Sequence, residues 1–209
     1  NCDVLIIRHH LDGSARLAAR HLEIPVFNAG DGKHEHPTQT ILDLFTIREH
    51  LGRLEDFDIG VAGDLKYGRT VHSLMMAMSR WNTVFNFIAP EELKMPDEFK
   101  LYLDNLGLKY YEHSDFNDII SKADIIYMTR VQKERFSDPI DYEKVKNIYV
   151  LRNSMLENTK PTMRILHPLP RVNEISPDVD SNPKAYYFKQ ALNGVFTRQA
   201  IICKLLNIK

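Results

Sequence analysis

The chain has 209 residues, of which 44% are hydrophobic and 26% are charged, and its formal net charge is −1. These values are typical of a globular protein that can bury a sizeable core in one large or two small domains. The near-neutral charge argues against a nucleic-acid or membrane-surface partner, since both need a concentrated basic face, so arginines placed locally must hold any anionic ligand.

The cysteines and the first residues bear on the compartment. Only Cys2 and Cys203 are present, without metal or redox spacing, so we expect neither a disulfide framework nor a zinc site. No apolar run reaches the roughly 18 residues of a membrane helix, and residues 1–4 lack the features of a signal peptide. We therefore expect a cytoplasmic protein. Because residues 4–7 already have the pattern of a buried strand, we also expect a longer polypeptide.

Apolar runs of strand length alternate along the chain with segments of helical period, which favours parallel βα units. Strands are predicted at residues 4–8, 25–28, 58–63, 84–89, 108–112, 124–129, 148–151 and 163–166. Helices are predicted at residues 14–22, 38–51, 69–81, 97–106, 116–122 and 183–206. Polar residues 136–142 and 171–181, each containing proline, are predicted to be long surface loops. The predicted fold class is therefore α/β.

A glycine-rich turn leads into His-Pro-Thr-Gln at residues 36–39, where a helix should begin. The positive end of a helix disfavours imidazolium, so His36 could stay neutral and donate a hydrogen bond to a carbonyl oxygen. Gln39, one turn into the helix, could bind an amide-like group. The alternative is that His36 merely caps the helix and Gln39 faces solvent. His34 and His36 could also suggest a metal, but a third ligand at a suitable spacing is missing.

A strand over residues 58–64 leads into a helix whose first turn carries Arg69. A strand-to-helix turn places free N–H groups at the carboxyl edge of a parallel sheet, which predicts an anion site. Residues 63–70 differ by one residue from a Walker A loop, because Arg69 stands where that loop has lysine. No later strand ends in aspartate, which argues against a nucleotide-binding P-loop. The structural alternative is that Arg69 forms an ion pair with a neighbouring acid such as Asp64 and binds no ligand.

Two further polar clusters follow later strands. Arg130 comes directly after the strand at 124–129, so it should emerge beside Arg69, where two guanidinium groups can clamp a dianion. The strand at 163–166 leads into His-Pro-Leu-Pro-Arg at residues 167–171. Its two prolines lack N–H groups, so this segment offers carbonyl oxygens that suit an ammonium or amide group. An ordinary strand-exit loop is the alternative.

Taken together, four segments of the chain resemble signatures of catalytic chains in the aspartate/ornithine carbamoyltransferase family: residues 36–39, 63–73, 127–135 and 167–171. The resemblance covers essentially the whole chain. Leu169 follows Pro168 where the ornithine enzymes carry a cysteine, which favours the aspartate branch. The resemblance implies transfer of the carbamoyl group from carbamoyl phosphate to the amine of L-aspartate, a step of pyrimidine biosynthesis. It implies no metal, no covalent intermediate and no organic cofactor.

The same resemblance implies which residues would bind carbamoyl phosphate. Arg8 and His36 would contact its carbonyl oxygen, and Gln39 would contact its amino group. These three would be the catalytic residues, because they stabilise the negative charge that develops on the carbonyl oxygen. The main-chain carbonyls of Leu169 and Pro170 would bind the nitrogen groups of the substrates.

For aspartate, the resemblance implies two arginine-centred contacts. Arg69 and Thr70 would hold the α-carboxylate, and Arg130 and Gln132 would hold the β-carboxylate. The carbonyl of Leu169 would lie near the aspartate nitrogen.

The resemblance further implies two α/β domains that close on the substrates. Residues 1–36 and 191–209 would belong to a carbamoyl-phosphate-binding domain, and residues 37–190 would form a three-layer aspartate-binding domain with a parallel sheet. The family's Ser-Thr-Arg-Thr phosphate loop and its lysine-bearing loop are absent from this sequence, so we expect that an N-terminal part is lacking and that these residues alone are inactive. The family also implies a homotrimer, with regulatory chains or a larger polypeptide left open.

Two other functional classes stay open at this point. A P-loop-like nucleotide-binding protein would bind ATP or GTP with magnesium. A non-catalytic carbamoyltransferase-like scaffold would keep the fold without binding substrates. The intact set of polar site residues argues against the scaffold, since desolvating such groups without a ligand costs stability.

Overall fold

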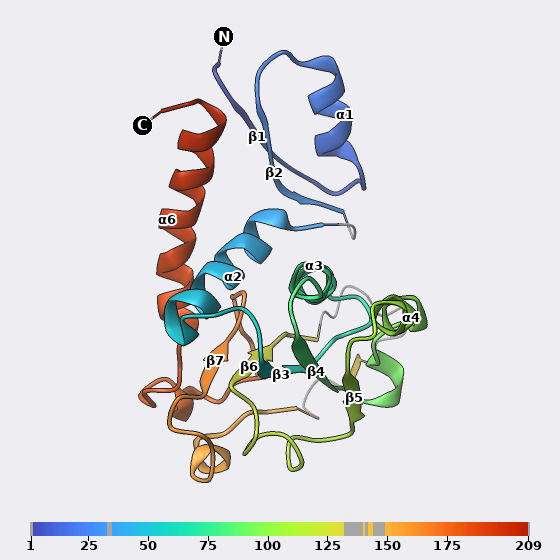
Figure 1. Ribbon diagram of the computed structural model, residues 1–209, viewed down its shortest axis with the longest axis vertical. Coiled ribbons are helices and arrows are strands. Elements are labelled where there is room, and N and C mark those ends of the chain that lie inside the picture. Colours follow the sequence, from blue (N-terminus) through green and yellow to red (C-terminus); the bar gives the residue numbers. More distant parts are fainter. Residues whose placement is uncertain (1, 33–34, 132–139, 141, 144–148, 209) are drawn as a thin grey trace.

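A computed structural model describes residues 2–32, 35–131, 140, 142–143 and 149–208. Two parallel sheets lie at opposite ends of the molecule (Figure 1). The smaller sheet pairs β1 (Leu5–His9) with β2 (Val26–Asp31), and the two strands are connected by α1 (Ser14–His21). This βαβ unit contains one predicted site residue, Arg8, and its second strand leads into residues 36–39.

The larger sheet has five parallel strands in the order β5-β4-β3-β6-β7. Its strands are β3 (Phe57–Ala62), β4 (Thr83–Ile88), β5 (Tyr110–His113), β6 (Ile125–Met128) and β7 (Arg164–Leu166). From the central β3 the chain first adds strands on one side and then crosses to the other side. The order therefore reverses between β3 and β6, and ligands of open α/β sheets bind at such a switch point, beyond the carboxyl ends of the strands.

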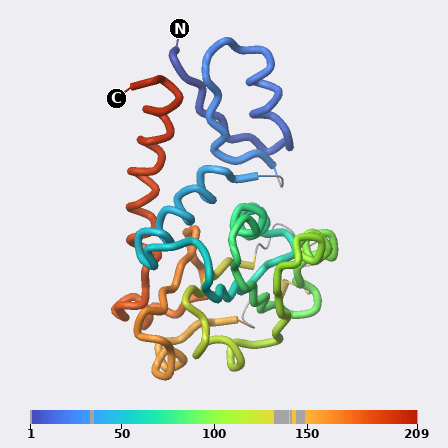
Figure 2. The backbone as a smooth tube through the Cα atoms, viewed as in Figure 1, coloured from blue at the N-terminus to red at the C-terminus, as the bar shows by residue number. Residues whose placement is uncertain are grey.

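Helices connect and cover the two sheets. They are α2 (Pro37–Leu51), α3 (Arg69–Met78), α4 (Asp97–Asn105) and α6 (Tyr187–Leu205), with 3₁₀ turns η1 (Glu91–Leu93), η3 (Asn153–Leu156) and η4 (Pro177–Val179). Helix α2 contacts β2, α3 and α6, so it lies between the two sheets, and α6 runs beside it toward both chain ends (Figures 1 and 2). Among the described residues, the helices are too short or too polar to span a bilayer.

The two faces of the larger sheet bury separate cores, as the two-residue period of a strand requires. Ile59 and Tyr127 face a core shared with α2, α3 and α4, whereas Ala62, Ile126 and Met128 face a second core. Turns and 3₁₀ segments cover that second face, because its outer residues come from 116–123, η3 and η4. The predicted three-layer α/β architecture is confirmed.

Several predicted elements differ from the structure. The strand expected at 148–151 is reduced to a single bridge between Leu151 and Ile175, and residue 148 lies outside the described residues. Residues 116–122 form hydrogen-bonded turns, not a helix. Only Ile120 and Ala123 there make i→i−4 bonds, and these are not consecutive.

The last helix begins at Tyr187, four residues later than predicted. Ala185 pairs with Ile165, which extends the backbone just before the helix. The helix expected to end at Trp81 ends at Met78.

The two predicted surface loops have different outcomes. The segment 171–181 is not simply a surface loop, because Glu174, Ile175 and Val179 are buried. In the other predicted loop, residues 140 and 142 are helical, so the prediction of a loop is wrong there, and residues 136–139 and 141 lie outside the described residues.

Candidate active site

A cleft of about 170 Å³ lies at the switch point of the larger sheet. Its lining residues are Arg8, His36, Gln39, Gly68, Arg69, Thr70, Thr129, Arg130, His167, Pro168, Leu169 and Pro170. The structure thus brings together all the site residues predicted from the sequence except Gln132, which lies outside the described residues. Their chemical roles remain predictions.

Five segments at or near the ends of strands and helices deliver these side chains. Arg8 comes from β1, and residues 36–39 begin α2 directly after β2. Arg69 begins α3 after β3, and Arg130 follows β6, the neighbour of β3 in the sheet. Residues 167–170 follow β7. Because all strands of the larger sheet are parallel, the last three segments meet at one edge.

His36 occupies the N-cap position of α2, with Pro37 next to it. Its side chain makes no capping hydrogen bond, so the alternative of a simple capping residue is not supported. Burial, followed by the nearby positive charges of Arg69, Arg8 and Arg198, lowers the pKa of His36 to about 4. The imidazole is therefore neutral at physiological pH and keeps one N–H group that can donate to a carbonyl oxygen.

Gln39 is buried, so the alternative that it faces solvent is wrong. Its side-chain Nε2 donates to Asp43 Oδ1 at 2.9 Å. Asp43 is fully buried and also accepts hydrogen bonds from Gln190 Nε2 at 2.6 Å and the Tyr127 hydroxyl at 2.7 Å. Burial raises the pKa of Asp43 to about 7 although these three donors oppose the shift. The sequence reasoning missed this carboxylate, for which the i,i+4 spacing from Gln39 was the available signal.

Arg69 connects the larger sheet to the loop after β2. Its Nη1 donates to the carbonyl oxygen of Gly32 at 2.6 Å. The same guanidinium lies close to Gly30, where a Cβ atom would be 3.1 Å from Nη2 and where φ is +121°. A side chain at Gly30 would therefore be strained and would displace the arginine. Arg69 is thus held where the two parts of the chain meet at the cleft.

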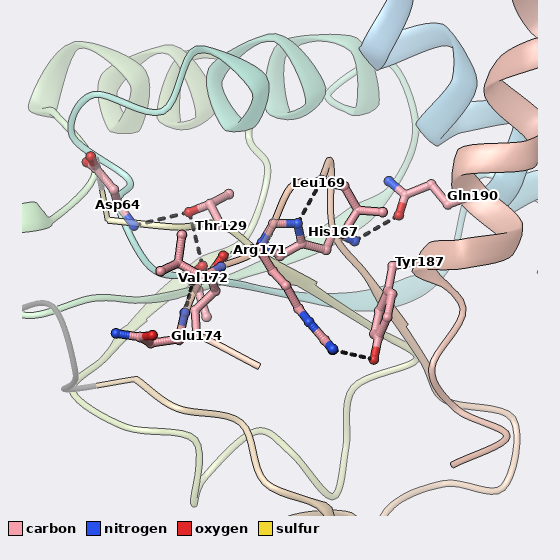
Figure 3. Close-up of polar contacts among 11 residues, drawn as sticks. Asp64, Thr129, His167, Leu169, Arg171, Val172, Glu174, Tyr187 and Gln190 are labelled. Atoms are coloured by element: carbon pink, nitrogen blue, oxygen red, sulfur yellow. Dashed lines mark hydrogen bonds and ion pairs between the residues drawn. The ribbon is translucent and has the colours of Figure 1, made fainter. Parts of the chain in front are cut away.

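The turn from β3 to α3 is not built like a P-loop, whose main-chain N–H groups must point at phosphates. Its N–H groups are largely occupied by acceptors within the protein. The donors and acceptors are Asp64 N to Thr129 Oγ1 at 3.1 Å (Figure 3), Leu65 N to Leu93 O at 3.1 Å, Tyr67 N to Asp64 Oδ1 at 2.9 Å and Arg69 N to Tyr67 O at 3.0 Å. This arrangement disfavours the nucleotide-binding alternative.

The loop after β7 is braced by a buried His–Glu pair. The Leu169 N–H donates to His167 Nδ1 at 2.8 Å, so the ring proton lies on Nε2, which donates to Glu174 Oε1 at 2.7 Å. The other carboxylate oxygen of Glu174 accepts the N–H groups of Val172 at 3.1 Å, a residue labelled beside it in Figure 3, and of Asn173 at 3.0 Å. Burial alone would raise the pKa of Glu174, but the bonds from His167 and the main chain hold it below its usual range.

Arg171 stabilises the outer part of this loop. It pairs with Asp180 and donates from Nη1 to the Tyr187 hydroxyl at 3.0 Å (Figure 3). At the other end of the loop, the His167 N–H donates to Gln190 Oε1 at 2.8 Å. Leu169, which lines the cleft, sits between these anchors with a φ of +52°. Sequence reasoning found the loop but none of its anchors, which lie on α6 or in a segment expected to be exposed.

Among the described residues, no group of three or more histidine, cysteine, aspartate or glutamate side chains is placed to hold a metal ion. His34 lies outside those residues.

Comparison with known proteins adds family matches over both parts of the chain. The family model described as the carbamoyl-P binding domain of aspartate/ornithine carbamoyltransferase matches residues 1–49, and the model of its Asp/Orn binding domain matches residues 55–205. The aspartate carbamoyltransferase catalytic subunit of Bacteroides thetaiotaomicron is 59% identical over 99% of this chain and 66% of its own length.

Solved structures agree with these matches. The catalytic subunit of M. jannaschii aspartate transcarbamoylase superposes with a TM-score of 0.92 at 45% identity, over 99% of this chain and 67% of that one. Aspartate transcarbamoylase from Trypanosoma cruzi in complex with carbamoyl phosphate and aspartate superposes with a TM-score of 0.86 at 34% identity, over 96% and 64%. The chain therefore spans about two thirds of the length of the relatives it matches.

Proposed function

Since the chain belongs to the aspartate/ornithine carbamoyltransferase family, we propose that its cleft serves aspartate carbamoyltransferase activity. Carbamoyl phosphate and L-aspartate would react to give N-carbamoyl-L-aspartate and phosphate. The observation that carries the proposal is a single cleft lined by Arg8, Arg69 and Arg130 around a neutral His36. Two of these arginines match the two carboxylates of aspartate, and Arg8 and the neutral imidazole can donate to the carbonyl oxygen of carbamoyl phosphate.

The reaction needs positioning and charge stabilisation more than protein nucleophiles. The aspartate amine attacks the carbonyl carbon, and negative charge grows on the carbonyl oxygen until the bond to phosphate breaks and the amine loses a proton. Arg8 and His36 would donate to that oxygen, a role worth a few kcal/mol per donor. Thr38 Oγ1 lies 3.4 Å from His36 Nδ1, so a hydroxyl donating there would leave the ring proton on Nε2.

The aspartate contacts follow from the two later arginines. Arg69 and Thr70 would bind the α-carboxylate, and Arg130 would bind the β-carboxylate together with Gln132. The carbonyls of Leu169 and Pro170 would accept hydrogen bonds from substrate nitrogen groups. Residues 1–36 and 191–209 would move with the carbamoyl-phosphate side, and residues 37–190 with the aspartate side.

The dianionic phosphate would need more cationic partners than Arg8 supplies, since the other two arginines would bind aspartate. We propose that the family's phosphate loop, which this sequence lacks, and a neighbouring subunit of a cytoplasmic homotrimer supply them. Regulatory chains would bind this trimer, or the chain would be part of a larger polypeptide.

The direct test measures carbamoyl-aspartate formation by the full polypeptide, with ornithine replacing aspartate as the specificity control. Turnover with aspartate and none with ornithine is expected. Magnesium-dependent hydrolysis of ATP or GTP without carbamoyl transfer would favour the P-loop alternative instead. A folded protein that neither turns over nor binds carbamoyl phosphate by calorimetry would be a scaffold.

A further inference from the structure

Asp43 lies behind the cleft in the second turn of α2 and is fully buried. Three elements reach its carboxylate: Gln39 from α2 itself, Tyr127 from β6 and Gln190 from α6. Of these partners only Gln39 lines the cleft. A buried carboxylate with three donors is strongly constrained, because each donor that lost its acceptor would be left unpaired in the interior.

The direction of each hydrogen bond follows from one donor that cannot be reversed. The main-chain N–H of His167 can only donate, and it points at Gln190 Oε1 at 2.8 Å. The other end of that amide, Nε2, therefore faces Asp43 Oδ1 at 2.6 Å, which makes Oδ1 an acceptor. The atom of Gln39 that lies 2.9 Å from the same Oδ1 must then be Nε2.

The amide of Gln39 has one donor end and one acceptor end, so its oxygen is left for the cleft. We propose that Asp43 is a positioning residue that turns the Gln39 oxygen toward the substrate, as an acceptor for the amino group of carbamoyl phosphate. This inference rests on the proposed function, and it explains how the site would select a carbamoyl group over a group that lacks N–H donors. A donor that lacked N–H groups would leave the buried amide oxygen unpaired, and such sites discriminate strongly.

The role does not depend on the charge of Asp43. A proton shared with the Tyr127 hydroxyl would sit on Oδ2, and Oδ1 would still accept both amides. The substitution Asp43→Asn can reproduce this pattern, with its oxygen toward both glutamines and its NH₂ toward the tyrosine oxygen. Asp43→Leu keeps the branching of the side chain but has no acceptor, so the Gln39 amide is free to turn.

The experiment compares two phosphates in the full polypeptide: carbamoyl phosphate as substrate and acetyl phosphate, with methyl in place of NH₂, as competitive inhibitor. Asp43→Leu should raise KM for carbamoyl phosphate by about tenfold, the value of roughly one hydrogen bond. The inhibition constant of acetyl phosphate should stay within about twofold, because methyl makes no use of the amide oxygen. Asp43→Asn should restore the wild-type ratio.

Asn193→Leu is the matched control, since it removes a buried amide that connects α6 to α2 through Thr46 and Glu49 and leaves the bond from Gln39 to Asp43 intact. It should lower the melting temperature without changing the ratio of the two constants. If Asp43→Leu does not fold, Asp43→Ala replaces it, because the smaller side chain leaves space for water beside Gln190.

If Asp43→Leu, or Asp43→Ala in its place, shifts both constants equally or shifts neither, the inference is overturned, whereas wild-type turnover still upholds the proposed function. Wild-type protein that forms no carbamoyl-aspartate overturns both.

Discussion

Replacing Glu174 by glutamine should destabilise the protein far more than an isosteric change suggests. The residue is 6% exposed, and its two carboxylate oxygens receive only donors: His167 Nε2 on one side and the N–H groups of Val172 and Asn173 on the other. The new NH₂ group must face one of these sides. His167 cannot move its proton to Nδ1 to help, because that nitrogen accepts the Leu169 N–H.

At least one buried donor is therefore left unpaired in Glu174→Gln, which costs about 1–3 kcal/mol, and the remaining bonds lose their charge assistance. The total is about 2–4 kcal/mol, or a melting temperature lower by roughly 5–15 °C for a chain of this size. Because the loop that carries Leu169 is loosened as well, KM for carbamoyl phosphate should rise.

Calorimetry or urea unfolding of the full polypeptide measures this effect, with the exposed Glu157→Gln as the matched control. The pKa of Glu174 is lowered from its usual 4.5, so the carboxylate's contribution is fully present above that pH and is lost as the pH falls through the lowered value. The gap between the two proteins should accordingly close at strongly acidic pH. Equal melting temperatures for Glu174→Gln and wild type at pH 7 would refute the proposed bond directions.

Three further outcomes are expected. His36→Ala should lower kcat by roughly 10²–10³, and a variant that retained kcat would show that His36 is only a binding residue. Since the pKa of His36 lies at about 4, the kcat of the wild type should show no titration of His36 between about pH 5 and 8. Arg130→Ala should raise KM for aspartate by about a hundredfold or more, through loss of a desolvated pair, and leave KM for carbamoyl phosphate nearly unchanged; steady-state kinetics with unaltered aspartate KM would contradict the assignment. Because the pKa of Asp43 is raised from 3.8 to about 7, its contribution to stability is fully present below pH 3.8 and is lost as the pH rises through 7. The melting temperature of Asp43→Asn should therefore rise relative to that of wild type across this pH range. A difference in melting temperature that does not change with pH would show that Asp43 does not titrate there.

The location of the cleft could be predicted from the sequence because it depends on a rule of topology. Parallel strands that alternate with helices end at one edge, so Arg69 after β3 and Arg130 after β6 had to lie close together once those strands were neighbours. The residue types were equally informative, since arginines at such an edge match carboxylates and phosphates. Neither the inference from topology nor the inference from residue type requires knowledge of a contact between side chains that are distant in the sequence.

The predicted elements that differ in the structure show where apolar pattern alone misleads. Tyr149 and Leu151 are buried, as their strand-like run suggested, yet only Leu151 pairs with another segment. An apolar run of this kind therefore indicates burial but does not require that the segment pair with a neighbouring strand. Phe116, Ile119 and Ile120 have helical spacing, but Asp115 Oδ1 accepts the Asn117 N–H at the start of the segment. That local turn competes with a helix too short to propagate beyond its costly first turn.

The buried polar layer behind the cleft was beyond sequence reasoning for a different reason. Gln39 and Asp43 have the i,i+4 spacing of a helix pair, but the same spacing is equally common on exposed faces, where it would orient nothing. What makes it informative is Gln190, 147 positions away from Asp43, whose own direction is decided by a main-chain N–H at His167. The types of group that face the substrate can thus be inferred from local motifs. Which end of the Gln39 amide faces the cleft depends on partners from another strand and another helix, so the selectivity that we propose for the site would be a property of the tertiary structure.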